Sequence, residues 1–211
     1  MANPSRSQIA GAPRLRVVQA GPVEAKAPPP SDEELIQAIE NCDGSAADAL
    51  YERLFGVVDG TLYRVFGRRE VDHDDLVQTA FEQIVTTLAR RKYARACSLS
   101  TWASTIASHV GLNALRARRR ERRVFDRGVS ADAERLGPVS GDGESRESAR
   151  AEIRGHLAAM APEKATTLFL HDVLGHELAE IAVMTGVSVS AAQSRLVRGR
   201  RELQDRVRGS A

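Results

Sequence analysis

The sequence is poor in the residues that build metal centres and disulfide frameworks. Its only two cysteines, Cys42 and Cys97, lie far apart and outside any CxxC spacing, which argues against a zinc ribbon and against a disulfide-stapled fold. The five histidines include no pair at the i, i+4 spacing of a helical metal site, and the closest two, His171 and His176, are five positions apart. We therefore expect neither a metal site nor a cofactor.

Long apolar runs and enzyme signatures are missing as well. No stretch approaches the roughly 18 residues that a membrane-spanning helix needs, and the N-terminus has no apolar signal core. We find no Gly-rich phosphate loop and no nucleophile beside a base motif. Asp72, Asp74 and Asp75 could gather on a metal ion, but acids at the start of a helix need no such role. We therefore predict a cytoplasmic protein that does not insert into a membrane and is not an enzyme.

Aromatic residues make up only 4% of the chain and the formal net charge is only +2. The abundance of Ala, Leu, Val and charged residues favours an all-α fold. The charge is unevenly distributed: residues 31–82 hold four basic and thirteen acidic side chains (a balance of −9), whereas residues 90–123 hold ten basic and one acidic (+9). This asymmetry suggests an acidic part that faces something other than DNA and a basic part that faces phosphate. The alternative is a pair of solvated faces that attract each other.

Helical patterns occupy a first domain over residues 31–124. Ser31 is placed as the N-cap of a short helix, and residues 46–66 continue the helical spacing. Residues 74–88 repeat apolar side chains every three to four positions after an acidic start. A further helix, from about Thr101, has an apolar stripe and ends in a run of arginines. Trp102 on that stripe is either a core residue or a platform for a stacked base.

Three further segments are distinguished by composition. Residues 1–30 hold six of the eight prolines and are predicted to be a disordered tail. The Gly-, Ser- and charge-rich residues 125–150 are predicted to be a flexible linker.

Residues 151–208 are predicted to form a second domain with a helix-turn-helix pattern, in which Gly186 suits the turn. On a wheel of 100° per residue, the core face of its last helix comprises Val189, Ala192, Leu196, Leu203 and Val207. The opposite face comprises Ala191, Ser194, Arg195, Arg198 and Arg201.

Four short sequence patches follow one another in an order and spacing that can be compared with known families. They are Asp75-Leu76-Val77-Gln78 with Phe81, Thr101-Trp102 with Ile106-Ala107, Glu180-Ile181-Ala182, and Ser194-Arg195-Leu196. In these patches the chain resembles the bacterial RNA polymerase sigma factors of the extracytoplasmic-function class, over roughly residues 32–206. The resemblance implies two small helical domains, a region 2-like bundle and a region 4-like helix-turn-helix, joined by a flexible linker.

The resemblance implies a contact with core RNA polymerase through the helix at 74–88, which would dock on the β′ clamp helices. Carried over by position, the contact residues are Asp75, Gln78, Thr79, Glu82 and Val85. Thr79 stands where the family often has Glu. The alternative is that these polar side chains only solvate an exposed helix.

The resemblance also implies two contacts with promoter DNA. Strand capture at the minus-ten element needs a basic track and groups that can hydrogen-bond or stack on an exposed base. The candidates for it are Arg95, Ser108, His109, Asn113, Arg116 and Arg119. A recognition helix would read the minus-thirty-five element in the major groove. Its candidates are Ser190, Ala191, Ser194, Arg195 and Arg198, of which Ser190 and Ala191 stand where the family commonly has Gly and Thr.

The function predicted from these patterns is that of an initiation subunit, which binds core polymerase and directs promoter recognition and DNA melting. The alternative is a helix-turn-helix regulator that acts without polymerase. That alternative explains only the second domain and predicts self-association on symmetric half-sites. An anti-sigma factor is a typical partner of the class, although no residue of the sequence identifies one.

Overall fold

The computed structural model describes residues 29–128 and 142–210, and every regular element in those ranges is helical. This confirms the predicted all-α fold class. The elements are α1 (Asp32–Glu40), α2 (Ala46–Phe66), α3 (His73–Ala89), α4 (Leu99–Gly128), α5 (Asp142–Ala159), α6 (Pro162–Leu168), the π-helical turn η1 (Phe169–Val173), α7 (Leu178–Thr185) and α8 (Val189–Ser210). The predicted tail lies outside the described residues except for its last two prolines. No helix in the described ranges is both long and apolar enough to cross a membrane.

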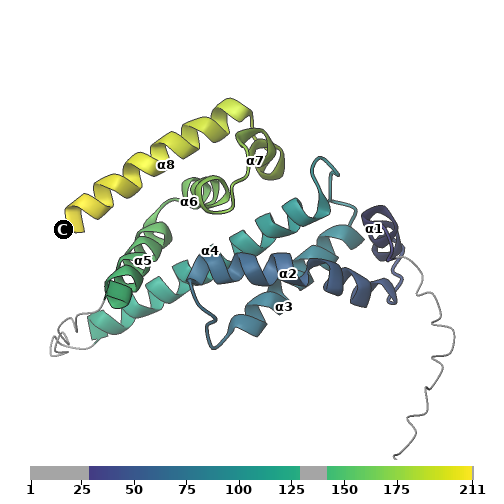
Figure 1. Ribbon diagram of the computed structural model, residues 1–211, viewed down its shortest axis with the longest axis horizontal. Helices are drawn as coiled ribbons and strands as arrows, with labels where there is room; N and C mark the ends of the chain where they lie inside the picture. Colours follow the sequence, from purple (N-terminus) through teal and green to yellow (C-terminus); the bar gives the residue numbers. More distant parts are fainter. Residues whose placement is uncertain (1–28, 129–141, 211) are drawn as a thin grey trace, which may run out of the picture.

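The first domain packs α1, α2 and α3 around the N-terminal half of α4 (Figure 1). As predicted, Ser31 caps α1: the Glu34 backbone N–H donates to its hydroxyl at 3.3 Å, and the Glu34 carboxylate accepts from the Ser31 backbone N–H at 2.7 Å. These bonds satisfy N–H groups that a helix start leaves unpaired. The core of the domain consists of fully buried aliphatic side chains, among them Leu50, Leu54, Leu62, Ile84, Leu88 and Leu112.

Trp102 belongs to this packing. It lies partly buried against the core of the first domain, and its ring centroid is 4.7 Å from that of Tyr93. Tyr93 is itself buried and donates its hydroxyl to the carbonyl of Cys97. The pair of rings therefore fixes the loop before α4 onto the domain, and in this arrangement Trp102 is a core residue.

The second domain contains the predicted helix-turn-helix in α7 and α8. Gly186 ends α7 with φ 66°, the left-handed conformation that glycine adopts without a steric penalty. Ala192 and Leu196 of α8 are buried as predicted, and Leu203 packs at the edge of a small core. The prediction is wrong at the two ends of this helix, where Val189 is 48% and Val207 38% exposed. The apolar clusters of this domain meet α8 only through Ala192, Leu196 and Leu203, so they do not reach its ends.

The predicted linker is shorter than the sequence indicated. Helix α4 continues to Gly128 and α5 begins at Asp142, so helix occupies both ends of residues 125–150. Five of the thirteen residues in these ends are Arg or Glu, which have high helix propensity even without an apolar stripe. The two domains also contact each other, because α5, α6 and η1 pack on α4, and Phe169 of η1 joins the core of the first domain.

Candidate protein and nucleic-acid interfaces

The five residues predicted to contact polymerase share one side of α3. Asp75, Gln78, Thr79 and Glu82 are exposed there and Val85 is half-buried. The Gln78 amide donates to the Glu82 carboxylate at 3.0 Å, and the Thr79 hydroxyl donates to the Asp75 carbonyl at 2.8 Å. Helical spacing alone brings these side chains together, so this surface was accessible to sequence reasoning.

A groove beside this face was not predicted. It has a volume of about 640 Å³ and lies between α2 and α3, where Gln78, Glu82 and Val85 form part of its wall. Tyr51 and Phe55 of α2 form the opposite side and are 45% and 37% exposed. The Tyr51 ring centroid lies 4.6 Å from that of Phe81 and 5.3 Å from that of Phe55.

The groove has the composition of a protein-binding surface, since exposed aromatic side chains beside an acidic rim are typical anchors of interfaces. The helical spacing of residues 46–66 does not by itself separate Phe55 from the buried positions beside it. The signal that could have separated them is the i, i+4 spacing of Tyr51 and Phe55, one position after the buried Leu50 and Leu54.

The residues predicted for strand capture do not form one open surface. Arg95 lies in the loop before α4 and is ion-paired with two carboxylates of α1, Glu33 and Glu40 (3.1 Å to Glu40). Ser108 is fully buried, and its hydroxyl donates to the Ser104 carbonyl at 2.7 Å. Asn113 is exposed on α4 and accepts a hydrogen bond from the Arg116 guanidinium at 2.8 Å.

Arg116 is half-buried, and its burial lowers the pKa of the guanidinium below its ordinary value. The pKa of His109 is also lowered, chiefly by partial loss of solvent around the ring and further by the charge of Arg116, although the side chain keeps an exposed edge. This shift favours the neutral imidazole, which donates a hydrogen bond from one ring nitrogen and accepts one at the other. Arg119 donates to the Gly155 carbonyl of α5 at 3.0 Å.

The second domain covers part of the polar face of α4. The Ser104 hydroxyl lies 3.0 Å from Nε2 of His176, and the Thr105 hydroxyl donates to the Met184 sulfur at 2.8 Å. Ser104 and Thr105 are buried, and Ser108 is buried one turn further along. In this arrangement, these hydroxyl groups are out of reach of a DNA strand.

The predicted recognition face is open on α8. Ser190, Ser194 and Arg198 are exposed, and Ala191 and Arg195 are half-buried. The helix start is fixed by Ser188, whose hydroxyl accepts from the Ala191 backbone N–H at 3.2 Å.

One carboxylate lies on that face: Asp205 pairs with Arg201 at 4.0 Å, toward the end of α8. Arg200 pairs with Asp172 of η1 (3.0 Å from Nε to Oδ2), whereas Arg198 bonds only to the Ser194 carbonyl at 3.1 Å. Among the described side chains, neither Arg195 nor Arg198 is paired with a carboxylate. The face therefore presents two available guanidinium groups, the side chains that most often recognise guanine or phosphate.

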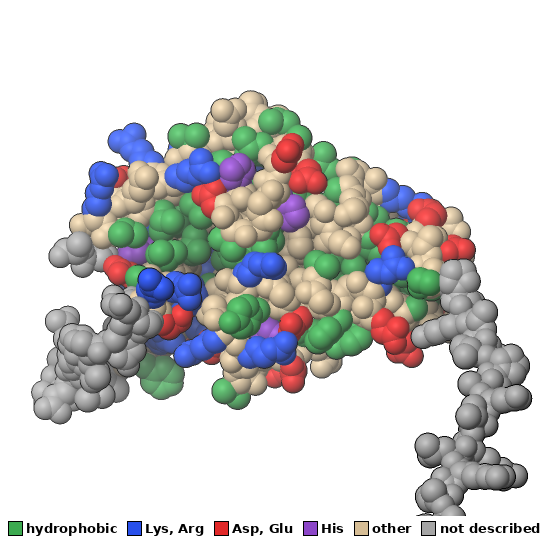
Figure 2. Space-filling view, viewed as in Figure 1, with side chains coloured by type: hydrophobic (Ala, Val, Ile, Leu, Met, Phe, Trp, Pro, Cys, Tyr) green, Lys and Arg blue, Asp and Glu red, His purple; other side chains and the backbone are tan. Residues whose placement is uncertain are grey.

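The acidic and basic segments partly compensate each other, because Arg91 and Arg95 pair with carboxylates of α1. Figure 2 shows basic side chains gathered toward the end where α8 and the end of α4 lie, and acidic side chains toward the opposite end around α1. In the part of the chain that the structure describes, no group of three or more His, Cys, Asp or Glu side chains is arranged to hold a metal ion.

Comparison with known proteins gives matches to both domains. Residues 50–121 match the family model for Sigma-70 region 2, and residues 150–203 match the model for Sigma-70, region 4. The ECF RNA polymerase sigma factor SigG of Mycobacterium tuberculosis, in strains CDC 1551 / Oshkosh and ATCC 25618 / H37Rv, is 34% identical over 172 residues. That alignment covers 71% of this chain and 45% of the relative, so the chain spans less than half the length of these relatives.

A solved structure, that of CnrH in complex with the cytosolic domain of CnrY, has a similar fold. Its TM-score is 0.50 at 18% sequence identity, and the superposition covers 85% of this chain and 99% of that one.

Proposed function

Since the chain belongs to the sigma-70 family of RNA polymerase sigma factors, in the extracytoplasmic-function class, we propose that it binds core RNA polymerase and directs promoter recognition and DNA melting at the start of transcription. The proposal is supported by two surfaces that occur together in this chain. One is the acidic, aromatic-lined α2–α3 surface, and the other is a helix-turn-helix with available arginines. A DNA-binding regulator alone would not need the first of these surfaces.

The α3 face and the adjoining groove are proposed to dock on the β′ clamp helices of the polymerase. Asp75 and Glu82 supply negative charge that steers a basic partner, and Tyr51 and Phe55 supply apolar area that the contact would bury. A helix laid into a groove is a common way to bury such side chains.

The DNA contacts are proposed to come from α8 and α4. Arg195 and Arg198 would enter the major groove of the minus-thirty-five element, with Ser190, Ala191 and Ser194 close to the bases. His109, Asn113 and Arg116 would meet the melted minus-ten strand, where contacts that favour the open strand over the duplex promote melting. Polymerase would supply the active site, so we assign no covalent chemistry to this chain.

The packed arrangement of the domains keeps part of the polar face of α4 from DNA, because Ser104 and Thr105 lie buried against the second domain. The predicted contact Ser108 is buried as well. We propose that the domains separate when the chain binds polymerase, and that the free chain binds promoter DNA weakly because most molecules are in the packed state. We also propose a cytoplasmic location and, from the family, an anti-sigma factor as an inhibitory partner.

Promoter affinity with and without core polymerase tests this function. We expect tight, sequence-specific binding and run-off transcripts only when core polymerase is present. Tight specific binding by the free chain, with no transcript after addition of core, would contradict the proposal and favour a regulator that acts alone.

A further inference from the structure

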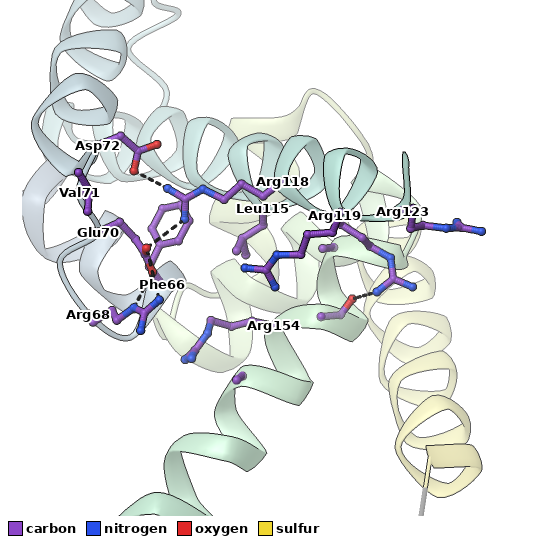
Figure 3. A pocket seen from close by; sticks show the side chains of 14 residues that line it. Phe66, Arg68, Glu70, Val71, Asp72, Leu115, Arg118, Arg119, Arg123 and Arg154 are labelled. Carbon is purple, nitrogen blue, oxygen red and sulfur yellow. Dashed lines mark hydrogen bonds and ion pairs between the residues drawn. The ribbon is translucent and has the colours of Figure 1, made fainter. Parts of the chain in front are cut away.

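A cavity of about 820 Å³ lies where the α2–α3 loop, the end of α4 and α5 meet (Figure 3). Its volume falls in the range of about 300–1,000 Å³ that is usual for small-molecule sites. Six arginines line it, against two carboxylates, Glu70 and Asp72, so that the lining carries a formal charge of 6 − 2 = +4. The six are Arg68, Arg118, Arg119, Arg122, Arg123 and Arg154.

Some of this charge is already compensated within the chain. Arg68 pairs with Glu70 at 2.7 Å, and Arg118 bridges Glu70 and Asp72 on one side of the cavity (Figure 3). Arg154 pairs at 2.5 Å with Glu147, which lies outside the lining. Counting Glu147 as well leaves a balance of 6 − 3 = +3.

The uncompensated charge belongs to the end of α4. Arg119 donates only to a backbone carbonyl, that of Gly155, at 3.0 Å. Arg122 makes no hydrogen bond or ion pair with any side chain that the structure describes. Cations that line one cavity repel one another, and an anion placed among them would offset that repulsion.

We propose that this cavity binds a small organic polyphosphate. Two phosphate groups carry about −1.5 to −2 charges each at pH 7, which matches the uncompensated +3 to +4. Guanidinium groups recognise phosphate through paired N–H donors. Apolar walls at Val71, Leu115 and Ala158 would contact the organic part of the ligand.

A compact ligand fits this place better than DNA does. In the packed state the arginines of α4 point in different directions: Arg119 bonds to α5, Arg118 points to the carboxylates of the α2–α3 loop, and Arg123 points away from both (Figure 3). They therefore form no continuous track for a DNA strand. A small polyanion can neutralise them while the domains stay packed. Because the walls come from α4 and from α5, the ligand would hold the two domains together and favour the packed state over the separated one.

Titration of the full-length chain with inorganic triphosphate tests the site by calorimetry. We expect saturable one-to-one binding that weakens about tenfold in Arg122→Ala, since one charge-assisted contact is lost, and further in Arg119→Ala/Arg122→Ala. Arg122 pairs with no side chain that the structure describes, so the single variant should unfold like the wild type. Arg64→Ala/Arg90→Ala removes two exposed arginines outside the cavity and should bind normally.

Energy transfer between two fluorescent dyes, one on α2 and one on α8, provides a second readout. Triphosphate should increase this energy transfer, because it would favour the packed state of the domains. Absence of saturable binding, equal weakening in the control variant, or a ligand-induced fall in energy transfer would overturn the proposal. Binding of a single-stranded oligonucleotide that needs Arg122, without binding of triphosphate, would also overturn it and assign these arginines to DNA. The site is built from the α2–α3 loop, the end of α4 and α5 and uses neither the α3 face nor the recognition face of α8, so its failure would leave the proposed polymerase function untouched.

Discussion

Gly111 sets how closely α4 can approach α2, and alanine at this position should destabilise the first domain. The added Cβ would lie 3.0, 3.1 and 3.2 Å from Cγ2, Cγ1 and Cβ of Val65, which is itself buried. Overpacking of this kind costs about 1–3 kcal/mol, whereas replacing glycine by alanine inside a helix gains about 1 kcal/mol. The clash outweighs the propensity gain, and we expect a net loss of roughly 1 kcal/mol in the free energy of unfolding.

Gly56 on α2 provides the matched control, because a Cβ there would meet no atom within 4 Å. Gly56→Ala should therefore stabilise the chain by about 1 kcal/mol, the opposite sign to Gly111→Ala. Urea unfolding followed by circular dichroism measures both. Val65→Ala should cost less in the Gly111→Ala background than alone, since it relieves the clash. A Gly111→Ala chain as stable as Gly56→Ala would refute the close packing of α2 on α4.

Three further outcomes follow from the surfaces. Arg195→Ala should cost about 1–3 kcal/mol in promoter affinity and relax preference at one base position; equal loss on every sequence would show a phosphate contact only. Truncation of Tyr51 and Phe55 to alanine should weaken core polymerase binding by about 2 kcal/mol, roughly thirtyfold, and unchanged affinity would remove the groove from the interface. The hydrogen bond from Arg200 is the main cause that lowers the pKa of Asp172. The ionised carboxylate therefore stabilises the fold at any pH above its ordinary pKa. This stabilisation is lost as the pH falls through the lowered pKa. Arg200→Gln should flatten the acid limb of stability against pH, and an unchanged limb would contradict that pairing.

Local chemistry explains what the sequence could predict. The capping box at Ser31 and the left-handed turn at Gly186 depend on residues within a few positions of each other, so their patterns are visible without a structure. The α3 face was likewise predictable, because helical periodicity alone gathers Asp75, Gln78 and Glu82.

Long-range packing explains what the sequence could not predict. The family resemblance implied that Ser108 contacts DNA, but the side chain is fully buried, and its burial depends on how α4 packs in the fold. The exposure of Tyr51 and Phe55 depends on the angle between α2 and α3. Four of the six cavity arginines belong to the basic tract of α4, but the sequence does not show that Arg68 and Arg154 join them from the α2–α3 loop and from α5.

The most direct test of the proposed function is a binding titration of the labelled chain against core RNA polymerase, repeated with Asp75→Arg/Gln78→Ala. A matched variant, Gln204→Ala/Asp205→Arg, makes the same two changes at exposed positions of α8. We predict saturable binding by the wild type and the α8 variant and its loss in the α3 variant. Absence of binding by the intact chain, or equal binding by all three, would contradict the assignment of α3 as the polymerase contact.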